Sequence, residues 1–471
     1  MCSVDPDEIT EMIKDTEELD IKSGEILCRK CNEDIAEVVL RKKDPYCKKC
    51  FLKYFIHKFR ATIGKSKMIF PNDRVLVSVS GGSSSMTLLH LLRGALDEDD
   101  HKKFRFVPYF LHIDECCLTD ANAKCISLDI CKHVSSKNFI CYTVSIEQSM
   151  SSDPITPLQY SEQTKHIVSE DLKFKLQELF NSCSSSSARE DLLLQLRQDM
   201  ISRCAESLGF TKVFVGDNAT GLAVSLLSSV AQGRGAHLAS KVHFKSLHGQ
   251  TENYRPMREL LINEIDAYIS INNISKFQTD NSGQGESIGQ CTEKFVLGLQ
   301  SEFPSTIPTI FRTGDKLASE NKMDSESGSN DNCALCGRIL DTDQGLASAL
   351  HATVVSQQMS VSNRSTIRSN EAVTEVSSPE KAVANSSAMN GGCCGEGGCC
   401  GGGGGGCGTS GSKAPCLELT KPLVESCLCY GCRVILRELA EVDKLPSVVK
   451  KAALTQEKRK QMKNEIKDFL L

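Results

Sequence analysis

Two closely spaced cysteine pairs near the start of the chain have the spacing of a metal site. Cys28 and Cys31 form one Cys-x-x-Cys pair, Cys47 and Cys50 form the next, and residues 32–46 separate them. Four thiolates on two tight turns match the tetrahedral coordination of Zn²⁺, and the spacing lies at the edge of the usual zinc pattern. Lysine and arginine within the pairs favour the ionised thiols that a metal needs. The alternatives are a redox pair or free thiols.

A second cysteine set lies far downstream and repeats this form. Cys333 and Cys336, like Cys429 and Cys432, make a Cys-x-x-Cys pair followed by a basic residue. We expect two halves of one structural zinc site with a long insertion between them, because the entropy of loop closure grows only logarithmically with length. The competing ligands are Cys427 and the cysteines of a Gly/Cys tract, namely Cys393, Cys394, Cys399, Cys400 and Cys407. We interpret that tract as low-complexity sequence.

A serine- and glycine-rich turn is the candidate for anion binding. It follows a short β-branched run at 74–80, and a helical pattern begins directly after it. In such a strand–loop–helix, glycines let the backbone approach a phosphate, while N–H groups and the helix dipole face the anion. The nucleotide-loop-like residues are Ser80, Gly81, Gly82, Ser83, Ser84 and Ser85, joined by Gly216, Asp217 and Asn218 of a later loop.

In order and context this turn resembles the PP-loop, the SGGxDS signature of ATP pyrophosphatases that adenylate a substrate carbonyl. Two later segments, 215–221 and 254–259, resemble the GHNxDD and RPL segments of the same superfamily. Ser84 stands at the acid position of the first signature, and Thr220 and Gly221 stand at the paired acids of the second. A serine supplies no charge to organise magnesium and pyrophosphate, which leaves open both ATP binding and a catalytic activity of this chain's own.

Together with the cysteine pairs, these segments resemble the cytoplasmic tRNA 2-thiolation protein 2 family, the second subunit of the cytosolic tRNA wobble-uridine thiolase. The resemblance covers about residues 28–340 and 427–471. It implies a heterodimer with a catalytic sister subunit, binding of tRNA, and sulfur that reaches the complex from a thiocarboxylated ubiquitin-like carrier. It also implies a cytoplasmic location and a role in forming 5-methoxycarbonylmethyl-2-thiouridine at the wobble position.

Two other functions stay open. The chain could be an independent ATP-dependent adenylating tRNA sulfurtransferase, against which the missing acids speak. It could also be a non-catalytic zinc scaffold unrelated to tRNA, against which the loop shape and a basic segment speak. Sulfur relay in this superfamily usually needs two placed cysteines besides the metal ligands. Cys116 or Cys117 is a candidate for the first position and Cys204 for the second, although no motif supports either.

Positive charge is concentrated in residues 41–67, where ten lysines and arginines face one acid, Asp44, in a chain of net charge -5. Interleaved aromatic residues predict a helix over 51–59 with one packed aromatic face and one exposed basic face. We expect the basic face to follow tRNA phosphates, the alternative being an ordinary solvated surface. The predicted tRNA-binding residues are Lys42, Lys43, Lys48, Lys49, Lys53, Lys58 and Arg60.

The elements that must position these residues alternate between strand and helix. Strands are predicted at 74–80, 104–113, 139–146 and 212–216, and helices at 85–96, 120–135, 157–180, about 188–208 and 218–231. This alternation predicts an α/β domain on a parallel sheet. By the resemblance it is a PP-loop ATPase-like (adenine nucleotide alpha hydrolase-like) domain, flanked by N-terminal and C-terminal zinc-ribbon modules.

Composition predicts the domain boundaries. The expected parts are an acidic arm at 1–27, a zinc module with the basic helix at 28–70, the α/β domain at 71–314, a linker with the first half of the second knuckle pair at 315–340, a disordered Ser/Gly/Cys-rich insertion at 341–426, and the second knuckle with a basic C-terminal helix at 427–471. Disorder is expected in the insertion because so few apolar groups cannot offset the entropy of ordering.

Length and charge exclude several classes of protein. At 471 residues the chain has room for two or three domains. With 55 lysines and arginines against 60 acids, it is not a uniformly basic nucleic-acid binder. The 24 cysteines, without a secretory signal at the N-terminus, indicate metal sites and buried thiols. No apolar run reaches the roughly 18–20 residues of a membrane helix, so we expect no membrane partner.

Overall fold

The computed structural model describes residues 26–98, 103–118, 126–161, 169–277, 286–317, 332–338, 340 and 419–467. All of them belong to one compact unit of the chain, Met1–Thr342 together with Leu419–Leu471. The expected acidic arm lies outside the described residues up to residue 25, and so does the expected insertion from 341 to 418. The last part of that insertion differs from the expectation, because residues 421–426 are helical.

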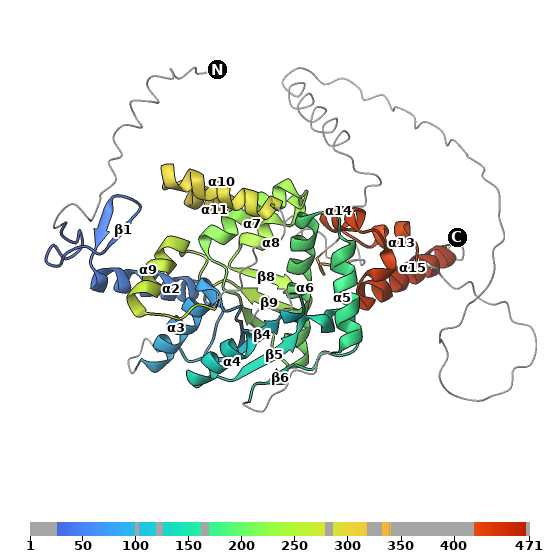
Figure 1. The fold of residues 1–471 in the computed structure, drawn as a ribbon, viewed down its shortest axis with the longest axis horizontal. Helices are drawn as coiled ribbons and strands as arrows, with labels where there is room; N and C mark the ends of the chain where they lie inside the picture. Colours follow the sequence, from blue (N-terminus) through green and yellow to red (C-terminus); the bar gives the residue numbers. More distant parts are fainter. Residues whose placement is uncertain are drawn as a thin grey trace, which may run out of the picture. The chain divides into compact units, whose positions relative to one another are not determined.

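A seven-stranded sheet forms the centre of this unit (Figure 1). Its strands are β3 (Arg74–Ser78), β4 (Val107–Asp114), β5 (Cys141–Ser145), β6 (Leu158–Gln159), β7 (Lys212–Phe214), β8 (Lys245–His248) and β9 (Thr251–Tyr254), in the order β6-β5-β4-β3-β7-β9-β8. The central five run parallel, and β6 and β8 pair antiparallel at the edges. The predicted α/β fold on a parallel-rich sheet is confirmed.

Strand β3 shows how the sequence builds a layer on each face of the sheet. Successive side chains of a strand point to opposite faces. Val75 and Val77 pack into one hydrophobic cluster and Leu76 into another. All three are at most 1% exposed. An uninterrupted apolar run is what a strand covered on both faces requires.

Helices cover both faces. α2 (Lys48–Ser66), α3 (Ser83–Asp97), α4 (Ser127–Ser136) and α9 (Ile262–Asn272) contribute to the cluster of Val75 and Val77, and α6 (Ser186–Ser207) contributes to that of Leu76. α7 (Ala219–Ala231), α8 (Leu238–Val242), α10 (Ile288–Glu302) and α11 (Thr306–Asp315) pack on one another. Short 3-10 turns lie at Cys116–Leu118, Ile146–Met150, Gly235–His237 and Val442–Lys444.

Two parts of the sheet differ from the sequence prediction. The helix predicted over 157–180 begins only at Glu170, as α5 (Glu170–Ser182), while β6 pairs with β5 ahead of it. The β8–β9 hairpin is not predicted at all. It turns at Gly249, whose φ of +58° is a conformation that favours glycine.

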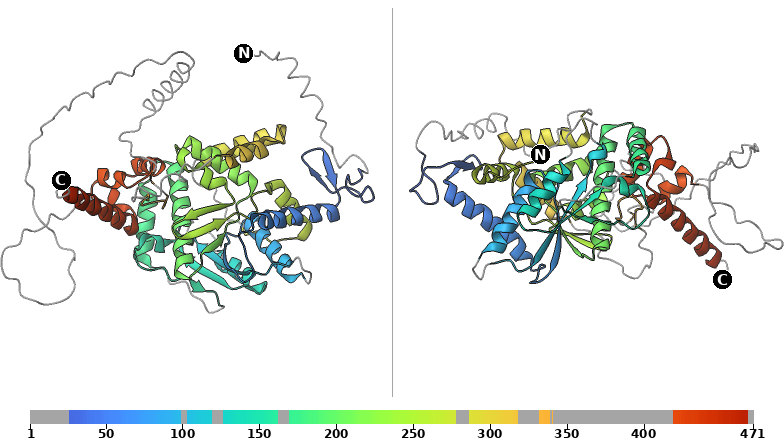
Figure 2. Two further views of the ribbon diagram at one scale, coloured as in Figure 1. Left: turned by 180° about the vertical axis from the view of Figure 1, so that it is seen from behind. Right: turned by 60° about the horizontal axis from the view of Figure 1, so that its bottom comes forward.

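Both cysteine-rich ends pack against the α/β core. At the N-terminal end, a hairpin of β1 (Val38–Leu40) and β2 (Asp44–Tyr46) leads into α2. At the C-terminal end, α13 (Lys421–Ser426), α14 (Tyr430–Glu438) and α15 (Ser447–Lys467) share a hydrophobic cluster with α5, with α6 and with the Cys333–Cys336 turn. Figure 2 shows these red C-terminal helices beside the green helices of the core. Among the described residues, no helix is both long and apolar enough to cross a membrane.

Candidate functional site: two four-cysteine centres and a serine-rich pocket

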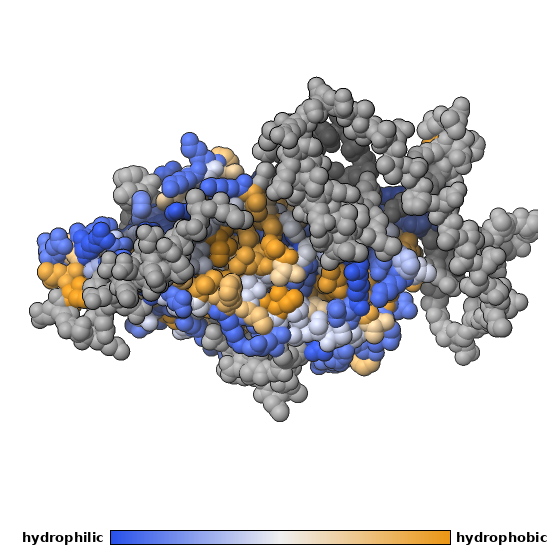
Figure 3. Space-filling model, turned by 90° about the horizontal axis from the view of Figure 1, so that it is seen from above, coloured by the Kyte–Doolittle hydropathy of each residue, from blue (hydrophilic) through white to orange (hydrophobic). Residues whose placement is uncertain are grey.

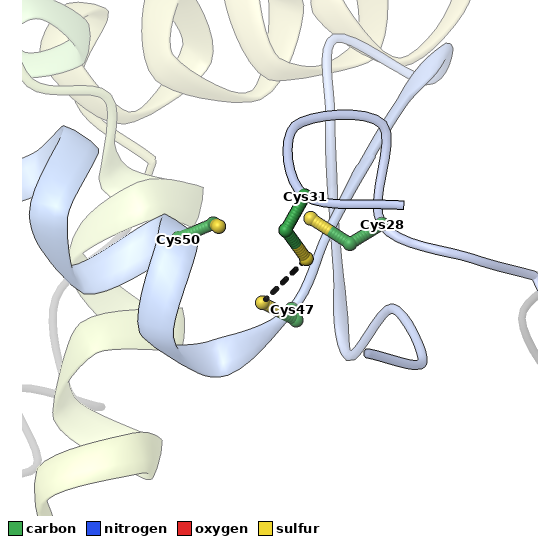
Figure 4. A group of neighbouring side chains, drawn as sticks. All are labelled: Cys28, Cys31, Cys47 and Cys50. Carbon is green, nitrogen blue, oxygen red and sulfur yellow. Dashed lines mark hydrogen bonds between the residues drawn. The ribbon is translucent and has the colours of Figure 1, made fainter. Parts of the chain in front are cut away.

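The structure brings together the four cysteines of the first set, which we call the N-terminal centre (Figure 4). Their Sγ atoms all lie within 4.8 Å of one another, and those of Cys31 and Cys47 are 3.9 Å apart. Cys28 and Cys31 lie on the turn before β1, whereas Cys47 is the N-cap of α2 and Cys50 belongs to its first turn. The positive end of the helix dipole therefore faces the sulfur atoms.

The thiols of the N-terminal centre are poised for a cation. Burial acts to raise the pKa of Cys28, but backbone N–H groups of Cys47, Cys31 and Lys30 outweigh it and lower the pKa to about 6. Desolvation and the neighbouring sulfurs raise the pKa of Cys50 to about 12. Adjacent thiolates repel one another, so all four ionise together only around a positive charge.

The C-terminal centre, formed by Cys333, Cys336, Cys429 and Cys432, has the same architecture but is fully buried. Cys429 is the N-cap of α14, and its Sγ lies 3.7 Å from that of Cys336. The Ala334 N–H donates to the carbonyl of Cys427 at 2.9 Å, which fastens the two halves together. Hydrogen bonds from the other thiols hold the pKa of Cys336 well below its ordinary value and that of Cys432 well above it.

The competing ligand Cys427 lies outside this centre. Its Sγ is 3.5 Å from the carbonyl oxygen of Leu423, one turn earlier in α13. The tract cysteines are outside the described residues.

A pocket of about 400 Å³ lies over the serine-rich turn. It is lined by Ser78, Ser80, Gly82, Ser83, Ser84, Ser85, Leu194, Arg197, Gln198, Ile201, Val215, Gly216, Asp217 and Ile262. Gly81 has a φ of +83°, and a Cβ there would lie 2.6 Å from the Ile130 side chain, so this position requires glycine. All of the predicted loop residues except Gly81 and Asn218 therefore line one cavity.

Hydrogen bonds and an ion pair tie the three loops of the pocket to one another. The Asn218 Nδ2 donates to the Ser84 Oγ at 2.7 Å, and its Oδ1 accepts from the Gly221 N–H at the start of α7. Asp217 pairs with the buried Arg255 at 3.0 Å. The Thr220 hydroxyl accepts from the Ile262 N–H at 3.1 Å. Ser84, Thr220 and Gly221, which stand at the acidic positions of the PP-loop signatures, therefore form hydrogen bonds that hold these loops together.

The candidate relay cysteines do not converge on this pocket. Cys204 packs within the cluster of Leu76 and Cys117 against the cluster of the C-terminal centre. Burial raises the pKa of Cys204 to about 12. Burial, with Glu147 and Asp114 nearby, raises that of Cys117 to about 12 as well. Such thiols stay protonated and are poor nucleophiles near neutral pH.

The basic segment divides into supporting and exposed cations. Lys58 donates to the buried Glu264 at 2.9 and 3.1 Å, and Arg60 pairs with Glu98. By contrast Lys43, Lys48 and Lys53 are exposed, as is Lys49, which lies 3.7 Å from Asp34, while Lys42 is half-buried. The aromatic face is packed, since Phe51, Phe55 and Phe59 are at most 1% exposed.

Comparison with known proteins decides the family. A family model described as Cytoplasmic tRNA 2-thiolation protein 2 matches residues 287–434. The relative of that name from Danio rerio is 33% identical over 100% of this chain and 99% of its own length. The chain belongs to the cytoplasmic tRNA 2-thiolation protein 2 family. The Homo sapiens member is 29% identical over 95% of this chain and 94% of its own.

Solved structures add a comparison for this family member. The U34-tRNA thiolase NcsA from Methanococcus maripaludis, solved with its 4Fe-4S cluster, is 15% identical, covers 66% of this chain and 95% of its own, and gives a TM-score of 0.49. An NMN synthetase from Francisella tularensis is 16% identical, covers 56% of this chain and 96% of its own, and gives a TM-score of 0.29.

The sequence of this tRNA 2-thiolation protein 2 family member does not predict two arginine contacts, one at the C-terminal centre and one at the pocket. Arg234 donates to the Cys432 Sγ at 3.6 Å and pairs with Asp191. Arg197, which lines the pocket, pairs with Glu115. No local motif marks these residues, because each partner comes from a distant part of the chain.

Proposed function

We propose that this chain is a subunit of a cytosolic tRNA thiolase complex that is required for 2-thiolation of the wobble uridine. The observation that carries the proposal is the full-length relation to a family named for tRNA 2-thiolation, at 33% identity with the Danio rerio member. The family name also supports a cytoplasmic location. The uridine product is the 5-methoxycarbonylmethyl-2-thiouridine of certain tRNAs.

Adenylation belongs to a catalytic sister subunit in this proposal. A PP-loop enzyme needs carboxylates to organise magnesium around the pyrophosphate. Here Ser84 is held by Asn218, Thr220 caps α9, and Asp217 is engaged by Arg255. The pocket therefore keeps the shape of the loop without its charge, and the sulfur carrier would act through the sister subunit.

We infer that both cysteine centres hold structural Zn²⁺. In a tetrahedron with Zn–S distances of about 2.3 Å, sulfur atoms are about 3.8 Å apart. The Sγ–Sγ distances of 3.9 Å in the N-terminal centre and 3.7 Å in the C-terminal centre fit this geometry. Each metal would join two Cys-x-x-Cys turns into one unit.

The tRNA surface lies, in this proposal, along the exposed cations of the N-terminal module. Lys43, Lys48, Lys49 and Lys53 offer charge without a fixed polar pattern, which suits phosphates better than base edges. Lys58 and Arg60 remain adjacent to this surface, but their main role is to hold α2 against Glu264 and Glu98.

A protein partner is supported by the surface shown in Figure 3, where apolar residues gather among polar ones. Helix α10, on that side of the molecule in Figure 1, exposes Ile288, Phe295 and Leu297, with Phe295 60% exposed. Monomeric proteins seldom leave large apolar areas open to water. We assign this area to the sister subunit.

The test is reconstitution with purified components. The chain alone, the sister subunit alone and both together are incubated with tRNA, ATP and the thiocarboxylated carrier, and 2-thiouridine and pyrophosphate are measured. We expect product only when both are present. Full activity of the chain alone would establish an independent sulfurtransferase instead, and full activity of the sister subunit alone would leave this chain without a role in thiolation.

A further inference from the structure

Arg234 is the largest fully buried side chain among the described residues, at 1% exposure. It lies just after α7, and its guanidinium contacts two partners from distant parts of the chain. Nε and Nη2 donate to the Asp191 Oδ2 at 3.1 and 2.5 Å, and Nη1 donates to the Cys432 Sγ at 3.6 Å. One side chain therefore bridges a ligand of the C-terminal centre and a carboxylate of α6.

The backbone around this bridge is tightly packed. A Cβ at Gly431 would lie 2.4 Å from the Arg234 Cγ, and one at Gly233 would lie 2.3 Å from the Tyr430 ring. Gly233 also has a φ of +73°. The 233–234 turn and the 430–432 knuckle therefore interlock, and the position of one fixes the position of the other.

Helix α6 extends from this bridge to the pocket. Asp191 lies in its second turn, and Leu194, Arg197, Gln198 and Ile201 of the same helix line the cavity. At 1.5 Å per residue, Arg197 is about 9 Å along the axis from Asp191. A helix transmits a shift of its N-terminal turns directly to these residues.

We propose that Arg234 is a positioning residue that couples the metal state of the C-terminal centre to helix α6 and thereby to the pocket. Four thiolates around one divalent ion carry two negative charges, and a buried guanidinium offsets part of them with a charge-assisted hydrogen bond. When the metal leaves, nothing holds the four sulfur atoms together, and the Cys432 sulfur loses its fixed place 3.6 Å from the guanidinium. The guanidinium then keeps only Asp191, and this incomplete pairing of a buried charge loosens the start of α6.

Among the described residues, no contact joins the N-terminal centre to α6. The buried ion pair on its helix α2 is that of Lys58 with Glu264, which joins α2 to α9. This pair also involves a buried carboxylate, so Lys58→Met is a matched control for Arg234→Met. The inference rests on the metal proposal for the C-terminal centre and goes beyond it.

The experiment uses the full chain, purified with its metal, and reads hydrogen exchange of the α6 amides from 191 to 201. In the wild type, stripping the metal with a chelator should speed exchange in this segment by about tenfold or more, because its opening free energy falls. In Arg234→Met the exchange should already be fast with metal bound, and stripping should add little. Lys58→Met should behave like the wild type in α6.

Two further measurements separate coupling from plain misfolding. The double variant Arg234→Met with Asp191→Leu removes both buried charges, and it should fold while losing the metal dependence of α6. With Co²⁺ in place of the native metal, Arg234→Met should shift the thiolate-to-cobalt absorption band and weaken metal affinity about 10–100-fold, whereas Arg234→Lys should recover part of both. Cysteine alkylation, mapped by mass spectrometry, should show that the loss of metal affinity occurs at Cys429 and Cys432.

The outcomes distinguish the two proposals. Wild-type protein that is folded but binds no metal at this centre overturns the metal proposal. The coupling alone is overturned in two cases, both with metal bound normally. In the first, hydrogen exchange in α6 of the wild type is the same with and without the metal. In the second, exchange in α6 of Arg234→Met equals that of the wild type.

Discussion

The Asn218 Nδ2 donates a 2.7 Å hydrogen bond to the Ser84 Oγ, joining two loops that are 134 residues apart in the sequence. The same side chain caps α7 through the Gly221 N–H. One amide therefore joins residue 84, the position where a PP-loop enzyme would place a carboxylate, to the start of a helix.

This link predicts the effect of restoring one acid. Ser84→Asp should leave pyrophosphate release by the lone chain at background, because Thr220 and Gly221 still supply no carboxylate and Asn218 still engages residue 84. The measurement is a coupled pyrophosphate assay with ATP and tRNA. Turnover well above background in the variant would contradict the assignment of adenylation to the sister subunit.

Removing the Asn218 side-chain amide should lower the free energy of unfolding and leave thiolation activity unchanged. Asn218→Ala deletes the N-cap of α7, which is worth about 1 kcal/mol, together with the bond to Ser84. Chemical denaturation of the full chain measures the change. Gln198→Ala, which also alters a pocket-lining residue but caps no helix, is the control and should change the free energy of unfolding less.

Metal content should follow the cysteine sets. Elemental analysis of the wild type should give two Zn²⁺ per chain, and Cys28→Ser or Cys47→Ser should reduce this to one, because a site with three thiolates binds more weakly. Cys291→Ser, at an exposed cysteine outside both centres, should leave the content unchanged. Iron in place of zinc, with visible absorption, would show that a cluster occupies a centre.

Stability should fall in mild acid because of His248. Burial and the nearby Arg338 lower the pKa of His248 from 6.5 to about 4. Between these values the unfolded chain binds a proton that the folded chain does not, so the free energy of unfolding decreases as the pH drops from about 6.5 to 4, by roughly 3 kcal/mol in all.

The check is denaturation of wild type and His248→Gln across this pH range. The variant should lose stability less steeply, and the difference between the two curves isolates the histidine from metal release, which both proteins share. Parallel curves would rule out this group as the origin.

Exposed and supporting cations should respond differently to charge reversal. Replacing Lys43, Lys48 and Lys53 with Glu should weaken tRNA binding by the complex and lower the salt dependence by about 0.7–0.9 in log–log slope per lost contact. Lys58→Glu should instead destabilise the fold, because it faces Glu264 with a like charge. Binding isotherms over a salt series and thermal melts separate the two effects. Unchanged affinity and slope in the triple variant would move the tRNA surface elsewhere, the basic C-terminal helix being the next candidate.

The long segment between the halves of the C-terminal centre should be dispensable. Residues 345–416 are rich in serine, alanine and glycine and poor in large apolar side chains, so deleting them should leave the melting temperature and 2-thiouridine formation near wild-type values. The helix α13 must be spared, because Val424 is fully buried in the C-terminal core. A large loss of either quantity would give the deleted segment a structural or functional role.

The sequence by itself predicts the features that depend on local pattern. The run Val75–Val77 is apolar throughout, so a strand buried on both faces follows from it, and the aromatic spacing of Phe51, Phe55 and Phe59 predicts the packed face of α2. The sequence also predicts which cysteines lie together, from the spacing of the first two pairs and from the shared form of the later two, and the structure brings each set of four together.

The tertiary structure alone decides the roles that depend on partners far away in the sequence. It assigns Lys58 to Glu264 across 206 residues, and it joins Arg234 to Cys432 across 198. Strand β9 of the β8–β9 hairpin pairs with β7, a partner that its own sequence pattern does not show. A charge or a short polar strand looks the same in the sequence whether it faces water or a buried partner, and only the fold supplies the partner that determines what it does.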